Sequence, residues 1–155
     1  MSDTSGYRLT YSTMFDPPPE MHERFEAALA EIRGTLGGRH AMSIGGREAL
    51  AERSFELRSP IDREILVGSF QAGDASHAHL AIQAAGKAFA SWSRTPWRER
   101  LAILRRAAAL IEDRVWTLSA GLSIEVGKNR MESLGEVQET ADLIHWYCDR
   151  MEESE

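Results

Sequence analysis

The stretch Ser123-Ile124-Glu125-Val126-Gly127-Lys128-Asn129 separates two predicted helices in the second half of the chain. The first begins near Val115 and ends near Gly127, because glycine adopts the left-handed conformation that ends helices without steric penalty. The second is a long amphipathic helix from about Met131 to Met151. The apolar stripes predicted for the two helices are Val115, Leu118 and Leu122, and then Leu134, Val137, Ala141, Ile144 and Tyr147.

Two more helices are predicted immediately upstream, so that the chain is helical from residue 74 to its end. Asp74 or Ser76 can cap the first of them by accepting backbone N–H bonds. Thr95-Pro96 marks the start of the second, because proline suits the first helical position. Their expected buried faces are Ala78, Ile82, Ala85, Phe89 and Trp92, and then Leu101, Leu104, Ala108 and Ile111.

The first half of the chain has three predicted segments. Residues 1–19 end in three prolines and are expected to form an extended arm. Residues 20–38 hold one amphipathic helix, which Gly37-Gly38 should end. Residues 39–73 alternate polar and apolar side chains between turn signals such as Gly45-Gly46, and this pattern predicts a small antiparallel hairpin region.

Composition narrows the function classes. A length of 155 residues corresponds to one domain, and a net charge of −6 without basic runs argues against nucleic-acid binding. The single cysteine, Cys148, fits a reducing cytoplasm. No apolar run approaches the roughly 20 residues of a membrane helix, and no secretory signal is visible.

Few residues stand out as chemical candidates. His77 and His79 are two positions apart, which does not suit a helical zinc site, and a surface or capping role is the better interpretation. Cys148 is interpreted as a buried small hydrophobe. Glu132, Glu136 and Glu139 share one helix face, and a solvated acidic face is the better interpretation. A functional role would need cations nearby, and Lys128 and Arg130 at the start of the same helix could only partly neutralise this face.

Several of these pieces, taken in order, resemble the start of the aldehyde dehydrogenase superfamily. Ser59-Pro60 before a strand, Ala84-Ala85-Gly86-Lys87-Ala88-Phe89 with Trp92, Pro96 with Arg100, and Glu125-Val126-Gly127-Lys128 carry the resemblance. It implies an α/β fold of which this chain holds the N-terminal part only, mostly helical with a small antiparallel β element. Residues 74–155 would then be the incomplete, helical start of the NAD-binding domain.

One branch of the superfamily is most similar: bacterial 1-pyrroline-5-carboxylate dehydrogenases, which oxidise L-glutamate γ-semialdehyde to glutamate with NAD in proline catabolism. Three features carry this closer resemblance: the helix that follows the N-terminal arm, the segment Met42-Ser43-Ile44-Gly45-Gly46, and the stretch from Glu125 to Asn129 with Glu132 and Asp142. It implies that Glu139 binds the amino group of the substrate, as a carboxylate pairs with an ammonium. It also implies a monovalent-cation site near Glu136.

The catalytic cysteine, the general base and the nicotinamide site of such enzymes fall beyond residue 155. We therefore expect no catalytic or cofactor-binding residue here, no NAD bound by this chain alone, and a missing C-terminal portion or complementary subunit as partner. The complete enzyme is expected to be a cytoplasmic homo-oligomer. Two alternatives stay open: a free-standing helical interaction module derived from this fold, and a piece of an aldehyde dehydrogenase that acts on another aldehyde.

Overall fold

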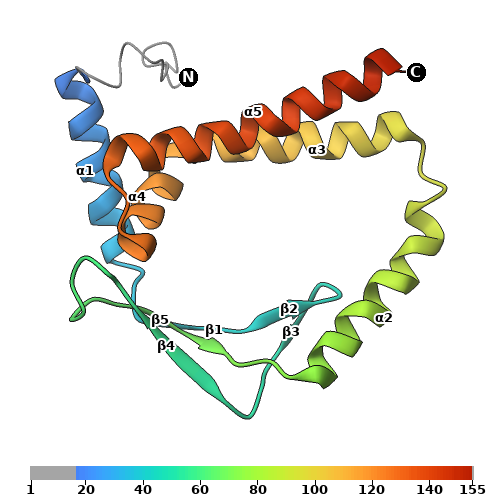
Figure 1. Cartoon of the computed structure of the whole chain (residues 1–155), viewed down its shortest axis with the longest axis horizontal. Coiled ribbons are helices and arrows are strands. Elements are labelled where there is room, and N and C mark those ends of the chain that lie inside the picture. Colours follow the sequence, from blue (N-terminus) through green and yellow to red (C-terminus); the bar gives the residue numbers. More distant parts are fainter. Residues whose placement is uncertain (1–16, 155) are drawn as a thin grey trace. The chain divides into compact units, whose positions relative to one another are not determined.

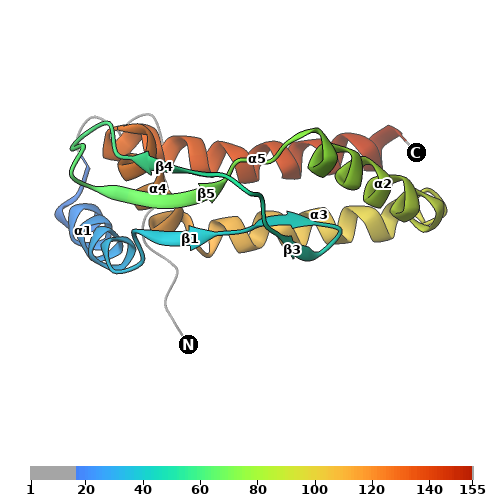
Figure 2. The ribbon, with the colours of Figure 1, turned by 90° about the horizontal axis from the view of Figure 1, so that it is seen from below.

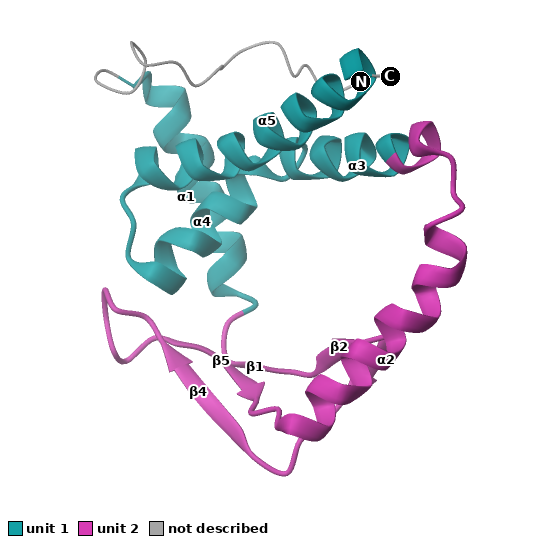
Figure 3. Cartoon of the chain, turned by 45° about the vertical axis from the view of Figure 1, so that its right-hand side comes forward, with its two compact units in different colours: residues 1–35, 101–155 teal, residues 36–100 magenta. Residues whose placement is uncertain are grey.

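The computed structural model describes residues 17–154, and the first 16 residues of the expected arm lie outside this range. The chain folds into two compact units, residues 36–100 and residues 1–35 with 101–155 (Figure 3). The elements follow the order α1 (Pro19–Arg33), β1 (Gly38–His40), β2 (Met42–Ile44), β3 (Arg47–Ala49), β4 (Ser54–Arg58), β5 (Leu66–Gln71), α2 (Ala75–Trp92), α3 (Trp97–Glu112), α4 (Val115–Val126) and α5 (Arg130–Ser154). The mostly helical content and the small β element agree with the expectation from sequence.

The helical pattern predicts α1 from about Glu20 to Leu36, and the observed helix begins one residue earlier, at Pro19, and ends three residues earlier, at Arg33. Pro19 occupies the first helical turn, where a missing N–H costs nothing, and Pro18 is extended. Gly34, not Gly37, caps the helix, because the N–H of Gly34 already bonds back to Glu31 and Ile32. Gly37 has a φ of 80° and turns the chain into β1.

The β region of residues 36–100 contains a hairpin and a three-stranded sheet. The hairpin β2–β3 turns at Gly45-Gly46, whose φ angles of 59° and 75° suit a tight two-residue turn. In the sheet, ordered β1-β5-β4, β4 pairs antiparallel with β5 as expected, and β1 adds a parallel pairing that the sequence pattern does not predict. A side chain at Gly68 of β5 would clash with the His40 ring, which stacks on Phe70.

The predicted buried face of α2 is wrong, because Ile82, Phe89 and Trp92 are exposed. The half-buried residues of α2 are His77 and Ala84, which lie two turns apart on one side of the helix. That side contacts β2, and Ala84 lies near Gly45 in the hairpin turn. The apolar stripe of α2 therefore points away from the hairpin that this helix contacts.

The described residues of the other unit, 17–35 and 101–154, form a helical unit. Its core is Met21 and Phe25 of α1 against Leu134 of α5, with Leu29, Val115, Trp116 and Met131 packed around them. Helix α3 runs alongside α5 in both ribbon views (Figures 1 and 2). Arg105 of α3 donates to Asp149 and Glu152 of α5 at 2.8 and 2.9 Å, which joins the two helices at one end.

The buried side of α4 also differs from prediction. It is formed by Ser119, Ala120, Ser123 and Ile124, while Leu118 is exposed. Small side chains allow a close approach to the start of α5, where the Ser123 and Ser133 hydroxyls are 2.8 Å apart. Hydrophobic periodicity does not reveal an interface built from serines.

In α3, Leu101 and Ala108 are buried as expected, but Leu104 is exposed. In α5, Leu134, Val137 and Ala141 are buried as expected, but Tyr147 is exposed and Cys148 is buried instead. Positions 134, 141 and 148 are each seven residues apart, which keeps them on one side of the helix. The interpretation of Cys148 as a buried hydrophobe is confirmed.

Candidate functional site

The start of α5 positions the acidic residues that the sequence singles out. Gly127 ends α4 with a φ of 77°, and its N–H bonds to the carbonyl of Ser123. The Asn129 side chain then accepts the N–H of Glu132 at 3.0 Å and caps the new helix. The predicted turn at Gly127 is therefore present, and Asn129 caps the helix that follows it.

The buried face of α5 determines where its carboxylates point. Leu134, Ala141 and Cys148 pack inward, while Glu132, Glu136 and Glu139 are exposed. Counted at 100° per residue, Glu139 lies opposite the core-facing side of the helix. Glu139 thus presents a solvent-accessible carboxylate, as binding of an ammonium group requires.

Glu136 has a cation partner within the chain. The Lys128 ammonium pairs with its carboxylate across the turn between α4 and α5. Arg130 does not neutralise the acidic face of α5, because its guanidinium pairs with Glu26 on α1. Lys128 and Glu136 are eight positions apart, on either side of the start of α5, and no spacing rule predicts such a pair.

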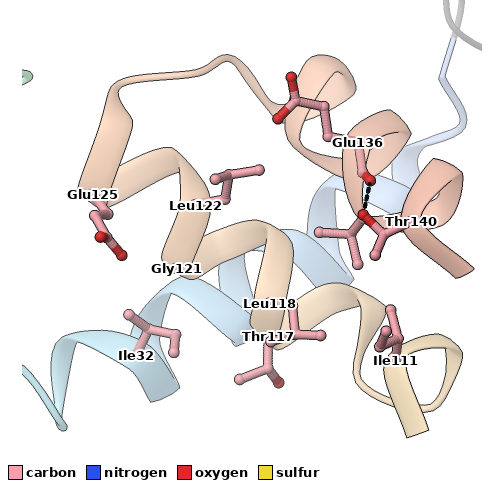
Figure 4. A pocket seen from close by; sticks show the side chains of 10 residues that line it. Ile32, Ile111, Thr117, Leu118, Gly121, Leu122, Glu125, Glu136 and Thr140 are labelled. Atoms are coloured by element: carbon pink, nitrogen blue, oxygen red, sulfur yellow. Dashed lines mark hydrogen bonds between the residues drawn. The ribbon is translucent and has the colours of Figure 1, made fainter. Parts of the chain in front are cut away.

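A pocket of about 480 Å³ opens in the helical unit beside Glu136 (Figure 4). Its walls are mostly apolar, and Glu125 and Glu136 contribute carboxylates. The Thr140 hydroxyl donates to the backbone carbonyl of Glu136 at 2.8 Å, as the dashed line in Figure 4 shows. The full lining is Ile32, Ile111, Thr117, Leu118, Gly121, Leu122, Glu125, Glu136, Val137 and Thr140.

Of the two site residues predicted from sequence, only one lies at this pocket. Glu136 belongs to the pocket, and Glu139 is not among the residues that line it. Glu125 joins Glu136 there although neither spacing nor periodicity links them. The pocket is also lined by Thr117, Gly121 and Thr140, which no motif or spacing in the sequence singles out.

The start of α2 shows strong local electrostatics. The Asp74 carboxylate accepts from the N–H groups of Ser76 and His77, and the His77 ring is 2.8 Å from the same carboxylate. Hydrogen bonds hold the pKa of Asp74 well below its usual range, and the largest contribution comes from the Ser76 hydroxyl and the next largest from the His77 ring. Two hydrogen bonds raise the pKa of His77: the one to the Leu50 carbonyl contributes most, and the one to the Asp74 carboxylate contributes next. The predicted capping roles of Asp74 and His77 are confirmed.

This cap bears on cofactor binding. Dinucleotide phosphates bind at helix N-termini that follow a strand, where free N–H groups face the anion. In residues 17–154, the helix that follows a strand of the three-stranded sheet is α2, and a carboxylate already occupies its N-terminus. The N-terminus of α2 thus does not fit a dinucleotide phosphate.

Across the same described range, no group of three or more His, Cys, Asp or Glu residues could hold a metal ion together. None of the helices described here is long and apolar enough to cross a membrane.

Comparison with known proteins decides the family. Residues 47–155 match the aldehyde dehydrogenase family. The chain belongs to this family. It is 37% identical to 1-pyrroline-5-carboxylate dehydrogenase 2 of Bacillus subtilis over 129 residues, which are 83% of this chain and 25% of that protein.

Solved structures agree with this assignment. A Thermus thermophilus 1-pyrroline-5-carboxylate dehydrogenase superposes with a TM-score of 0.84 and 30% identity, over 96% of this chain and 28% of that one. A Thermus enzyme of the same name, solved with bound NAD, gives 0.83 and 29% over the same shares. The aldehyde dehydrogenase fold predicted from sequence is confirmed, and the chain spans about a quarter of these relatives' length, in their N-terminal part.

Proposed function

We propose that this chain is the N-terminal portion of an NAD-dependent dehydrogenase that oxidises L-glutamate γ-semialdehyde to glutamate in proline catabolism. The observation that carries this proposal is the similarity to 1-pyrroline-5-carboxylate dehydrogenases in both sequence and fold, over 83% and 96% of the chain. Helix α5, which holds the proposed substrate contact, lies within the matched family segment.

Glu139 is the proposed substrate-binding residue. Its carboxylate is exposed on α5, opposite the face that packs against the core. An ammonium–carboxylate hydrogen bond selects an amino-acid aldehyde over a simple aldehyde, because only the former carries the positive group. This role makes Glu139 a determinant of specificity rather than a participant in hydride transfer.

The chemistry itself requires parts outside this chain. NAD, when bound to the complete enzyme, accepts the hydride of the oxidised aldehyde. Cys148 is fully buried and cannot attack an aldehyde, and the N-terminus of α2 is capped by Asp74. We therefore propose that residues 1–155 are inactive alone and act together with the missing C-terminal portion, as a cytoplasmic homo-oligomer.

The monovalent-cation role of Glu136 is a separate part of the proposal. The Lys128 ammonium already pairs with the Glu136 carboxylate, so a K⁺ or Na⁺ ion at this position would compete with an internal cation. Cation binding at Glu136 therefore requires Lys128 to move away.

The test uses a chimera that joins residues 1–155 to the part of the Bacillus subtilis relative beyond the matched segment. Glu139→Gln should raise KM for L-glutamate γ-semialdehyde by about 10- to 100-fold, the loss expected for a hydrogen bond to a charged group. Activity with an aldehyde that lacks the amino group should not change. Glu132→Gln, an exposed glutamate of the same helix, is the matched control.

Three outcomes separate the alternatives. An unchanged KM for Glu139→Gln contradicts the substrate role of Glu139. A chimera that oxidises another aldehyde better than the semialdehyde indicates a different branch of the family. NADH formation by residues 1–155 alone contradicts the proposed inactivity, whereas a stable, inactive monomer in sedimentation that melts cooperatively favours the free-standing interaction module.

A further inference from the structure

Helix α5 carries a second set of side chains on its outer side, beyond Glu139. Leu143, Trp146 and Tyr147 are exposed by 48%, 52% and 65%. At 100° per residue, all three lie on the half of the helix that faces away from Ala141 and Cys148. We call Leu143, Trp146, Tyr147 and Arg150 the outer α5 patch.

The aromatic side chains of this patch contact each other and Arg150 of the same helix. The Trp146 and Tyr147 rings meet edge to face, with centroids 4.9 Å apart. The Arg150 guanidinium lies 5.7 Å from the Trp146 ring centroid and also bonds to Glu153. Trp, Tyr and Arg are the residues most enriched at the energetic centres of protein interfaces. Preordered side chains also lower the entropy cost of binding.

We infer that the outer α5 patch is the surface on which the C-terminal remainder of the dehydrogenase packs. This inference rests on the proposed function. The relatives that this chain matches continue for about three quarters of their length beyond the shared part. Helix α5 ends at Ser154, eight residues after Trp146, or about 12 Å at 1.5 Å per residue. A polypeptide that follows residue 155 emerges beside the patch, at a local concentration in the millimolar range.

The position of the patch suits this occupant. Leu143 follows Glu139 by one helical turn on the same side of α5. An apolar surface packed on Leu143 and Trp146 would end next to the Glu139 carboxylate and shield one side of it from water. Such a boundary strengthens an ammonium–carboxylate pair, because a lower local dielectric increases the attraction between charges.

Thiol labelling can test the inference. Tyr147→Cys places a reactive group in the patch, and Ile103→Cys on α3, where Ile103 is 44% exposed, is the matched control. Maleimide labelling is followed by peptide mass spectrometry in the 155-residue chain and in the chimera. Buried Cys148 gives the background in the unsubstituted proteins. The chimera should label at position 147 at least about tenfold more slowly than the short chain, because a covered thiol loses access to reagent.

The outcomes are distinct. Equal labelling at position 147 in a chimera that melts cooperatively overturns the inference. Slow labelling in the 155-residue chain that speeds up on dilution, with a sedimenting dimer, assigns the patch to a second copy and also overturns it. If the chimera does not fold, hydrogen exchange of residues 143–150 is measured after mixing the two separate pieces, and unchanged exchange overturns it. A chimera that is protected at position 147 but inactive on the semialdehyde would support packing of the C-terminal remainder on the outer α5 patch. The same result would refute only the proposed function.

Discussion

The Phe25→Ala substitution tests which apolar residues of this chain build its core. Phe25 is 1% exposed and packs against Met21 and Leu134. The Arg130 guanidinium also lies 5.3 Å from the centre of its ring. Loss of a buried phenylalanine costs about 3–5 kcal/mol, and loss of the cation–π contact adds about 0.5–1 kcal/mol. The expected destabilisation is therefore about 3.5–6 kcal/mol, a large part of the 5–15 kcal/mol that stabilises a typical domain.

The same substitution at Phe89 is the matched control. Phe89 is 66% exposed on α2, and its ring belongs to the stripe that sequence analysis predicted to be buried. Phe89→Ala should change stability by less than about 0.5 kcal/mol, as exposed substitutions usually do.

Urea denaturation followed by far-UV circular dichroism measures both changes. With a slope of about 2 kcal/mol per M, Phe25→Ala should lower the midpoint by roughly 2–3 M, and Phe89→Ala by less than about 0.3 M. Equal shifts for the two variants would refute the assignment of the core to α1, α4 and α5. A large shift for Phe89→Ala alone would show that the α2 stripe is buried after all.

Three further predictions concern polar contacts. The pKa of His77 is raised in the folded protein, so protonated His77 stabilises the fold fully below the ordinary pKa near 6.5. This stabilisation is lost as the pH rises through the higher folded-state pKa. The melting temperature should therefore fall less between pH 6 and 8 in His77→Gln than in the parent. Lys128→Met frees the Glu136 carboxylate, so added KCl should raise the melting temperature more than in the parent, and an equal effect of KCl would contradict a cation role for Glu136. Ser123→Val inserts bulk where two buried hydroxyls meet at 2.8 Å, so it should cost about 1–3 kcal/mol in urea denaturation through overpacking, whereas a neutral result would mean that α4 and α5 can separate there.

The sequence predicted helix caps and turns correctly at positions where one residue type determines the backbone conformation. Asp74 caps α2, Gly45-Gly46 turns the hairpin and Gly127 ends α4, as their types predict. The same rules failed at the end of α1, where Gly34 stops the helix before the more prominent Gly37-Gly38 pair. Glycines occur at both positions, and the sequence alone does not determine which of them ends the helix before the following strand begins.

The site was partly predictable. A helical spacing of three and four placed Glu132, Glu136 and Glu139 on one face, and all three are exposed as a solvated face requires. The pairing of Glu136 with Lys128 depends on how the turn at Gly127 folds back, and the pocket beside it depends on four helices meeting. Neither follows from the spacing of residues in one helix.

By itself, the sequence determined the family, the helical second half and the turn that orients α5, because ordered motifs, caps and glycine turns act over a few residues. Only the tertiary structure decided which apolar stripes are covered. Phe25 and Phe89 both lie on apolar stripes of amphipathic helices, yet one is buried and the other exposed. Burial depends on what lies across from a helix face, and that neighbour comes from distant parts of the chain.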